Sequence, residues 1–271
     1  MSVSEICEAD FHYYVPTAME AKPFRQTVRT GREFENPGWE VCGFELKNHT
    51  SKIADWSSET DIQSTHYQEI SDFARQLTGC DFALVGGHIL RNPEQAELHE
   101  DLAPIQFVHS DFAESYGGLM REFYRSDAEE ARLGLEREEA TPQDVANASR
   151  MLILQFWRNV GPSVMDLPIA FCDARTVGEK EILAAPVEDY AGDGFDFETL
   201  AVLPPGDGHH AWYTYPDMSI DEVVAFRTYD SDLIGSGKPF WTPHSAYRNP
   251  DVALGEPARY SIELRATCLW K

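Results

Sequence analysis

The second half of the chain is a succession of short apolar runs, each ended by Gly, Pro or Asp. This pattern limits the possible folds most strongly. Runs of this kind occur at residues 168–173, 211–215, 222–229 and 240–244. The final run, residues 259–270, alternates in character as the two faces of a strand do. Many short strands separated by turn residues predict a mainly β fold, namely a sandwich or a jelly-roll barrel with helical insertions.

Helical patterns interrupt this β-rich order. Residues 66–78 have the pattern of a short helix, and the pattern from about 118 to 158 is again helical. A Thr-Pro-Gln-Asp sequence at residues 141–144 is typical of a helix start, because proline is tolerated in the first turn. Residues 151–157 are β-rich, although they could also be the end of the helix.

Length and composition fit one domain of this kind. Of the 271 residues, 42% are apolar and 12% are aromatic, which is enough to form a core. Single β-barrel and sandwich domains often reach this length. We therefore predict one domain over residues 1–271, with an N-terminal extension at 1–80 and a helical insertion at 115–158. The insertion is a candidate lid or dimer element.

The charge of the chain excludes several classes of partner. Its 46 acidic and 22 basic side chains give a net charge of −24, spread along the whole length. Nucleic acids and anionic membranes both select clustered Lys and Arg, so neither is an expected partner. No apolar stretch is long enough for a membrane span, and the N-terminus has no signal-peptide pattern. Five scattered cysteines without a Cys-x-x-Cys motif indicate reduced thiols in the cytoplasm, rather than disulfides or a zinc site.

One set of residues could form a metal site. His109 and Asp111 follow an apolar strand, and a spacing of two places both side chains on one face of the strand or its extension. A nitrogen ligand from a distant strand would complete a two-His-one-carboxylate triad, which leaves three positions of an Fe(II) octahedron open for a co-substrate and O2. His244 is the best candidate for this third ligand. Spacing alone also allows a structural, hydrogen-bonded His–Asp pair.

Other histidines fit a metal site less well. His99 precedes Glu100 and Asp101, but its polar surroundings favour a helix surface or a loop. His209 and His210 precede an aromatic strand, and a second metal site there is the weaker interpretation.

Two basic side chains on the last strand could bind a dicarboxylic co-substrate. Arg259 and Ser261 lie on one face and could bind the distal carboxylate of 2-oxoglutarate through the guanidinium fork and the hydroxyl. Arg265 competes for this role because it lies on the same face. We favour Arg259 because Ser261 stands beside it.

Arg158 stands in an apolar strand, where a buried arginine needs an anion. The anion could be an internal acid such as Asp173, or it could be the co-substrate or a substrate carboxylate. Since cations are scarce in this chain, we expect Arg158, Arg259 and Arg265 to face the anion-binding side of the iron site.

Four further residues are candidates for the pocket. His88 follows a glycine pair and forms a His-x-x-Arg element with Arg91, so it is either a substrate-pocket residue or a structural histidine. Tyr229 follows an apolar strand, where it is either a core residue with a satisfied hydroxyl or a catalytic contact. Trp157, beside the unusual Arg158, completes this group.

Several segments together resemble a known family of iron/2-oxoglutarate oxygenases. They read FVHSD at 107–111, FWRN at 156–159, LPIAFCDART at 167–176, HAWYTYPDM at 210–218, DEVVAFRTYDS at 221–231, TPHSAY at 242–247 and RYSIELR at 259–265. The family includes the cephalosporin methoxylation protein and fungal hydroxylase/desaturase and endoperoxide-forming enzymes, and is called CmcJ/AsaB-like or gibberellin A4-desaturase type. The segments follow the family's order and cover most of residues 80–271.

The resemblance implies a double-stranded β-helix, a cupin-like jelly roll, with Fe(II) held by His109, Asp111 and His244. It also implies 2-oxoglutarate and O2 as co-substrates. The chain departs from the family in two places: Asn-x-Trp-Arg-Pro becomes QFWRN at residues 155–159, and Pro-Arg-Glu-Ser becomes ARYS at 258–261. The second departure keeps the Arg and the Ser.

We therefore predict an Fe(II)/2-oxoglutarate-dependent oxygenase that acts on a small molecule of specialised metabolism. The outcome could be hydroxylation, desaturation, cyclisation or peroxide formation, and the sequence does not select one. Two alternatives are open. The chain could be an accessory component of a two-protein system with a methyltransferase, as the cephalosporin member suggests. It could also be a jelly-roll metalloenzyme that needs the triad but not Arg259 and Ser261. A homodimer is compatible with each of these.

Overall fold

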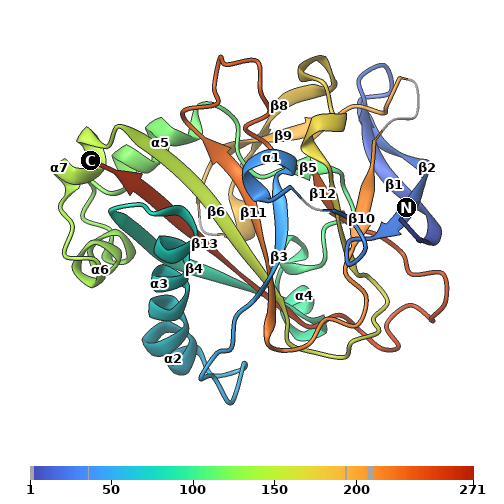
Figure 1. Ribbon diagram of the computed structural model, residues 1–271, viewed down its shortest axis with the longest axis horizontal. Helices are drawn as coiled ribbons and strands as arrows, with labels where there is room; N and C mark the ends of the chain where they lie inside the picture. Colours follow the sequence, from blue (N-terminus) through green and yellow to red (C-terminus); the bar gives the residue numbers. More distant parts are fainter. Residues whose placement is uncertain (1–2, 36, 193, 207–209) are drawn as a thin grey trace.

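Two curled β-sheets face each other in the computed structural model, which describes residues 3–35, 37–192, 194–206 and 210–271 (Figure 1). The eight-stranded sheet contains, in spatial order, β1 (Glu5–Val15), β2 (Glu20–Thr30), β10 (Trp212–Thr214), β7 (Ile169–Cys172), β12 (His244–Ala246), β5 (His109–Ser110), β9 (Phe197–Val202) and β8 (Ile182–Val187). The five-stranded sheet contains β3 (Phe44–Asn48), β11 (Glu222–Asp230), β6 (Arg150–Asn159), β13 (Ser261–Trp270) and β4 (Phe82–Arg91). The predicted mainly β fold with helical insertions is confirmed.

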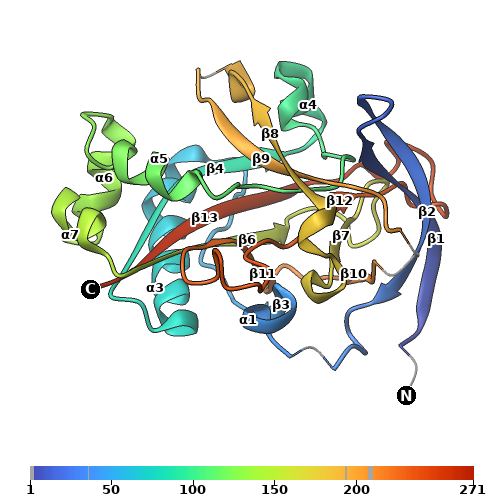
Figure 2. The same ribbon diagram turned by 90° about the horizontal axis from the view of Figure 1, so that it is seen from above.

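Short helices surround the sheets. They are α1 (Trp39–Cys42), α2 (Glu59–Asp61), η1 (Ile62–His66), α3 (Tyr67–Thr78), α4 (Pro93–Leu98), η2 (Glu100–Leu102), α5 (Tyr116–Phe123), α6 (Glu129–Arg137), α7 (Pro142–Asn147), η3 (Ala174–Thr176), η4 (Glu179–Glu181) and η5 (Tyr190–Gly192). Helices α5, α6 and α7 gather at one end of the molecule and the β1–β2 hairpin lies at the other end (Figure 2). None of the described helices is long and apolar enough to cross a bilayer.

The last strand, β13, separates a core face from a cavity face, as its alternation predicts. Ile262, Leu264 and Ala266 pack in the apolar cluster that includes residues of α3. Glu263 and Arg265 point the other way and line the cavity between the sheets. Since side chains alternate along a strand, the charged residues of β13 are concentrated on the inner face.

The predicted helical insertion at residues 115–158 ends earlier than expected. Helices α5 to α7 stop at Asn147, and residues 150–159 form β6, which lies at the centre of the five-stranded sheet. Strand β6 is buried on both faces over nearly its whole length, so it lacks the polar alternation that would have marked it as a strand. The helix start at Thr141 is confirmed, since its hydroxyl accepts a hydrogen bond from the backbone N–H of Asp144.

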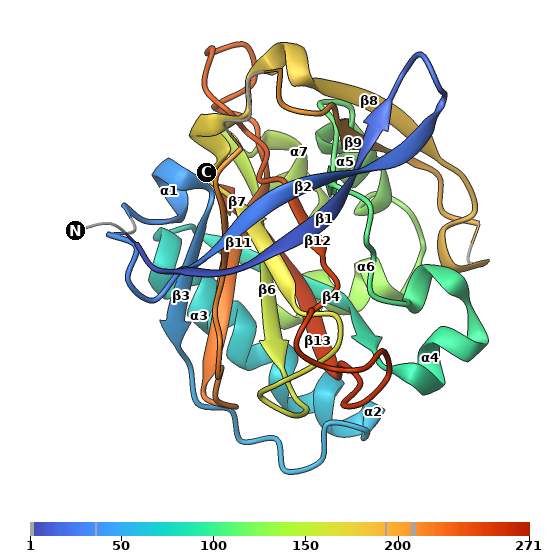
Figure 3. The ribbon, with the colours of Figure 1, turned by 90° about the vertical axis from the view of Figure 1, so that its right-hand side faces the viewer.

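The N-terminal region is built into both sheets. Strands β1 and β2 form one edge of the eight-stranded sheet, and β3 pairs with β11 in the other sheet (Figure 3). Residues 5–48 therefore complete the barrel rather than extend from it.

Strands β5 and β12 are shorter than the apolar runs that contain them. Strand β12 begins at His244, directly after Pro243, which has no N–H to donate to a ladder. Short as they are, the two strands pair with His244 directly opposite His109. This register brings together two histidines that are 135 positions apart in the sequence.

Candidate metal centre and cavity

His109, Asp111 and His244 converge at the inner face of the eight-stranded sheet. Their candidate ligand atoms all lie within 4.8 Å of one another. The Asp111 Oδ1 atom is 3.5 Å from His109 Nε2 and 3.2 Å from His244 Nε2. All three residues are buried. Two imidazole nitrogens and one carboxylate oxygen in this arrangement are the donor set of a facial triad, which suits Fe(II).

Both histidines are held in the orientation that a metal ligand requires. His109 Nδ1 is 2.7 Å from the carbonyl oxygen of Phe107, and His244 Nδ1 is 3.0 Å from that of Thr242. Because a carbonyl oxygen can only accept, each Nδ1 carries the proton and donates it. Each neutral ring therefore presents the lone pair of Nε2 toward Asp111, and these backbone contacts fix the tautomer as in known metal sites.

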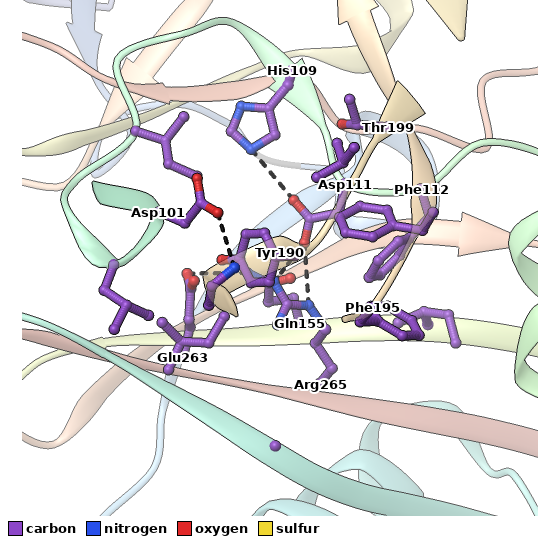
Figure 4. Close-up of a pocket in the computed structure, with 18 of the residues that line it drawn as sticks. Asp101, His109, Asp111, Phe112, Gln155, Tyr190, Phe195, Thr199, Glu263 and Arg265 are labelled. Carbon is purple, nitrogen blue, oxygen red and sulfur yellow. Dashed lines mark hydrogen bonds and ion pairs between the residues drawn. The ribbon is translucent and has the colours of Figure 1, made fainter. Parts of the chain in front are cut away.

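Arg265 holds the carboxylate of Asp111 from the opposite sheet. Its Nη2 and Nε atoms donate to Asp111 Oδ2 over 3.1 and 3.3 Å. Figure 4 shows Asp111 between His109 and Arg265. The two oxygens of Asp111 thus have separate roles, since Oδ2 accepts from Arg265 and Oδ1 faces the histidines. Burial favours the neutral form of Asp111, but Arg265 and the two histidines hold its pKa well below the usual range.

Arg259 is a buried cation without a carboxylate partner among the described residues. It is 3% exposed, its Nε donates to Ser261 Oγ over 2.9 Å, and its guanidinium lies over the Trp157 ring. Burial, and then repulsion by Arg91, lower the pKa of Arg259 to about 9. A buried guanidinium in this state is stabilised by an anion. Its place on the cavity wall, with Ser261 beside it, fits the distal carboxylate of 2-oxoglutarate.

The neighbouring cation, Arg91, is already neutralised. Its guanidinium forms an ion pair of 2.8 Å with Glu263, which is also buried. It donates further to the carbonyl oxygens of Asp101 and Ala103. Arg91 therefore lines the cavity but has no free donor pair for a second carboxylate. Gln155 donates to the other oxygen of Glu263 over 3.1 Å.

A cavity of about 910 Å³ opens beside these residues. One part of its wall carries the triad and the arginines. The remainder is mostly apolar and includes aromatic side chains from α5 and from the β8–β9 hairpin. Sequence reasoning assigned no role to this wall, although Phe112 and Tyr116 follow the His-x-Asp pair at helical spacing and stack with ring centroids 3.5 Å apart.

Arg158 does not reach this cavity, which corrects the expectation of a co-substrate contact. It donates to the carbonyl oxygens of His49 and Ile220 and contacts the His49 ring. The expected pair with Asp173 is not formed either, because Asp173 binds Arg175. The reason is the strand period: Gln155 faces the cavity, so Arg158, three residues later, points to the other face.

Trp157 and Tyr229 also lie outside the cavity lining. Trp157 packs between the sheets beneath Arg259, so its contact with the site is through that guanidinium. Tyr229 is a core residue of the cluster around α5, and its hydroxyl approaches Gly117. This agrees with the core interpretation of Tyr229.

Three of the other candidate histidines, His88, His99 and His210, have structural partners. His88 lines the cavity and contacts the Tyr67 hydroxyl and Glu59, over 2.9 and 3.1 Å. His99 caps η2 by accepting from the Asp101 N–H, away from the triad. His210 is buried against Tyr13, while His209 lies outside the described residues.

Comparison with known proteins identifies the family. A family model described as the oxidoreductase/YMDC permease-like domain matches residues 17–269. The chain belongs to this family. It is 28% identical to hydroxylase/desaturase CTB9 of Cercospora beticola, over 93% of this chain and 79% of that protein. It is 27% identical to hydroxylase/desaturase efuI of Hormonema carpetanum, over 84% of this chain and 77% of that protein.

The fold also matches a solved oxygenase. The iron and alpha-ketoglutarate-dependent endoperoxidase NvfI superposes with a TM-score of 0.74 over 97% of this chain and 98% of that one, at 18% sequence identity. The predicted double-stranded β-helix is therefore confirmed. The predicted membership of the hydroxylase/desaturase family of Fe(II)/2-oxoglutarate oxygenases is confirmed as well.

Proposed function

We propose that this chain is an Fe(II)/2-oxoglutarate-dependent oxygenase of the hydroxylase/desaturase type that acts on a small molecule of specialised metabolism. The observation that carries the proposal is the pairing of two features on one cavity wall. A triad with both histidine tautomers fixed lies beside a buried arginine that no described carboxylate neutralises. We also propose a cytoplasmic location, as five scattered cysteines without a Cys-x-x-Cys motif predict.

Each residue of the site has a distinct task. His109, Asp111 and His244 would hold Fe(II), which when bound supplies the activation of O2. Arg259 would bind the distal carboxylate of 2-oxoglutarate, and Ser261 fixes the direction of the Arg259 fork. The apolar wall excludes water from the reacting atoms.

Arg265 would keep Asp111 ionised and aligned through Oδ2. It is therefore a positioning residue, and it is not available for the co-substrate because its fork is already engaged. This leaves the assignment of the distal carboxylate to Arg259, the arginine favoured by the sequence.

A spectroscopic titration tests the proposal. Anaerobic protein mixed with Fe(II) and 2-oxoglutarate should develop the weak visible charge-transfer band of the iron chelate. The His109→Ala variant should lose the band, because one of three protein ligands is gone. The His99→Ala variant should keep it, because His99 only caps η2. A wild-type protein without the band would refute the proposal.

The test also separates the alternatives. A jelly-roll metalloenzyme that does not use 2-oxoglutarate would bind Fe(II) but show no chelate band. Arg259 argues against that alternative, because it is buried on the cavity wall and forms no ion pair with a described carboxylate, so such an enzyme would leave its guanidinium fork without an anion. An accessory protein would form the band without turnover, whereas an oxygenase should release succinate when O2 and substrate are added.

A further inference from the structure

The apolar part of the cavity restricts the class of substrate, provided that the proposed function is correct. We call this part the aromatic chamber and define it by the cavity-lining side chains of Phe112, Tyr116, Phe123, Phe195 and Phe197. Phe112 and Tyr116 stack at 3.5 Å, and the Phe197 ring stands edge-on to both, at 5.9 and 6.4 Å. Phe195 lies 5.5 Å from Phe197.

Aromatic faces and edges that line a cavity favour a planar or ring-containing ligand. Ring pairs gain energy at centroid distances of about 4.5–7 Å, in offset or edge-on geometry. The chamber provides both faces and edges, and it is continuous with the triad because Phe112 lines the same cavity as Asp111 and His109. Figure 4 shows Phe112 next to Asp111, and Phe195 lower in the view, toward Arg265.

No arginine or lysine of the cavity is left to bind a substrate anion. Among the described residues, the lining contains three such side chains, Arg91, Arg259 and Arg265. Arg91 is paired with Glu263, and Arg265 is engaged with Asp111. The third, Arg259, is assigned to the co-substrate. An additional carboxylate or phosphate inside the cavity would therefore be desolvated without a partner, which is costly.

Acidic residues at the edge of the cavity also disfavour an anionic substrate. Glu100 and Glu130 are exposed and line it, and Asp101 is half-buried beside them. The chain as a whole carries a charge of −24. Both features repel an approaching anion.

The size of the cavity allows a substrate of several rings. Sites for drug-sized ligands have volumes of about 300–1,000 Å³. The cavity of about 910 Å³ has to hold 2-oxoglutarate as well, and it leaves most of its volume to the substrate.

We propose that the substrate is an uncharged, ring-containing apolar molecule that binds in the aromatic chamber and carries no carboxylate or phosphate. Amino acids and acidic metabolites are excluded by this proposal. Phe195 and Phe123 are specificity-determining residues, because they line the chamber while remaining partly exposed, so a charged replacement at either position can be solvated.

Two fluorescent probes that differ by one anionic group provide the test. N-phenyl-1-naphthylamine is neutral, and 8-anilino-1-naphthalenesulfonate has the same rings with an added sulfonate. Both are titrated into the 271-residue chain loaded anaerobically with Fe(II) and 2-oxoglutarate, so that Arg259 is occupied. We expect the neutral probe to bind at least about tenfold more tightly, which is a difference of about 1.4 kcal/mol. Equal or tighter binding of the sulfonate would overturn the proposal.

Variants that add a positive charge to the chamber show where in the protein the probe preference arises. Phe195→Arg should reduce or invert the preference for the neutral probe, because it adds a cation to the chamber. Phe123→Arg is a second variant at the same chamber, used if Phe195→Arg does not fold by circular dichroism. Val41→Arg is the matched control, since Val41 is an exposed residue of α1 outside the lining. An unchanged preference in both chamber variants would overturn the assignment.

The chelate band, recorded in the same samples, separates this inference from the proposed function. A band together with an absent preference overturns the substrate class alone. A preference for the neutral probe without a chelate band overturns the proposed function. The ligand of the aromatic chamber would then no longer be identified as a substrate.

Discussion

Arg265, on β13, and Arg259, just before β13, both line the cavity. Replacing each by methionine, which keeps the length of the stem and donates no hydrogen bond, should affect two different equilibria. Arg265→Met removes both N–H donors from Asp111 Oδ2, at 3.1 and 3.3 Å. The carboxylate can then rotate and is more easily protonated. Losing such an outer partner lowers metal affinity about 10–100-fold, which corresponds to about 1.4–2.7 kcal/mol.

Arg259→Met should leave the triad intact and weaken the binding of the co-substrate instead. Among the described residues, the triad contacts do not include Arg259. Truncating one partner of a buried, hydrogen-bonded charge pair costs about 2–5 kcal/mol, so 2-oxoglutarate affinity should fall by about 30-fold or more.

Two titrations separate these effects. Equilibrium dialysis under anaerobic conditions gives the Fe(II) affinity, and the chelate band at saturating Fe(II) gives the 2-oxoglutarate affinity. Arg265→Met should change mainly the first and Arg259→Met mainly the second. If Arg265→Met abolishes 2-oxoglutarate binding at saturating Fe(II) while Arg259→Met binds it normally, the assignment of the two arginines is wrong.

Two further predictions concern stability. Gly117→Ala should lower the melting temperature, because its Cβ would lie 2.1 Å from the Tyr229 hydroxyl and overpacking costs about 1–3 kcal/mol. The Cβ added by Gly118→Ala would have no other atom within 4 Å, so this substitution should raise stability by about 0.5 kcal/mol. Equal effects at the two glycines would contradict the packing of Gly117 against Tyr229. Burial, and then the charge of Arg158, lower the pKa of His49 to about 4, so the unfolded chain binds a proton at His49 more readily than the folded one. The free energy of unfolding, measured in urea, should therefore fall as the pH drops from 7 to 5. The His49→Asn variant, which keeps an acceptor for Arg158, should show a smaller fall. An identical fall in both proteins would contradict this explanation.

Much of the site could be predicted from local sequence patterns. The His-x-Asp spacing and the alternation of the last strand depend only on the period of a strand, which is independent of tertiary context. Had Gln155 been known to face the cavity, the same period would have excluded Arg158 from the cavity lining. Strand β6 is buried on both faces, however, so its sequence does not show which face is the inner one.

The roles of the charged side chains depended on partners far away in the sequence. Arg259 and Arg265 look equivalent in the alternating sequence of residues 259–270, and the contact of Arg265 with Asp111 distinguishes them. Likewise, Glu263 neutralises Arg91 across 172 positions of the chain. Local patterns do not contain such pairings, so the sequence left the two candidate arginines open.

The placement of the aromatic chamber has a consequence for how such enzymes diverge. Its side chains come from α5 and its approach, between β5 and β6, and from the hairpin at the edge of the eight-stranded sheet. His109, His244 and Arg259 come from other segments, and Asp111 directly precedes Phe112 in the β5–α5 connection. Exchanges confined to α5 and to the loop between β8 and β9 leave the β5–β9 ladder that carries His109 in place. The chamber can therefore be reshaped for a new substrate while the iron site stays unchanged. Swapping these two segments between relatives should transfer substrate preference.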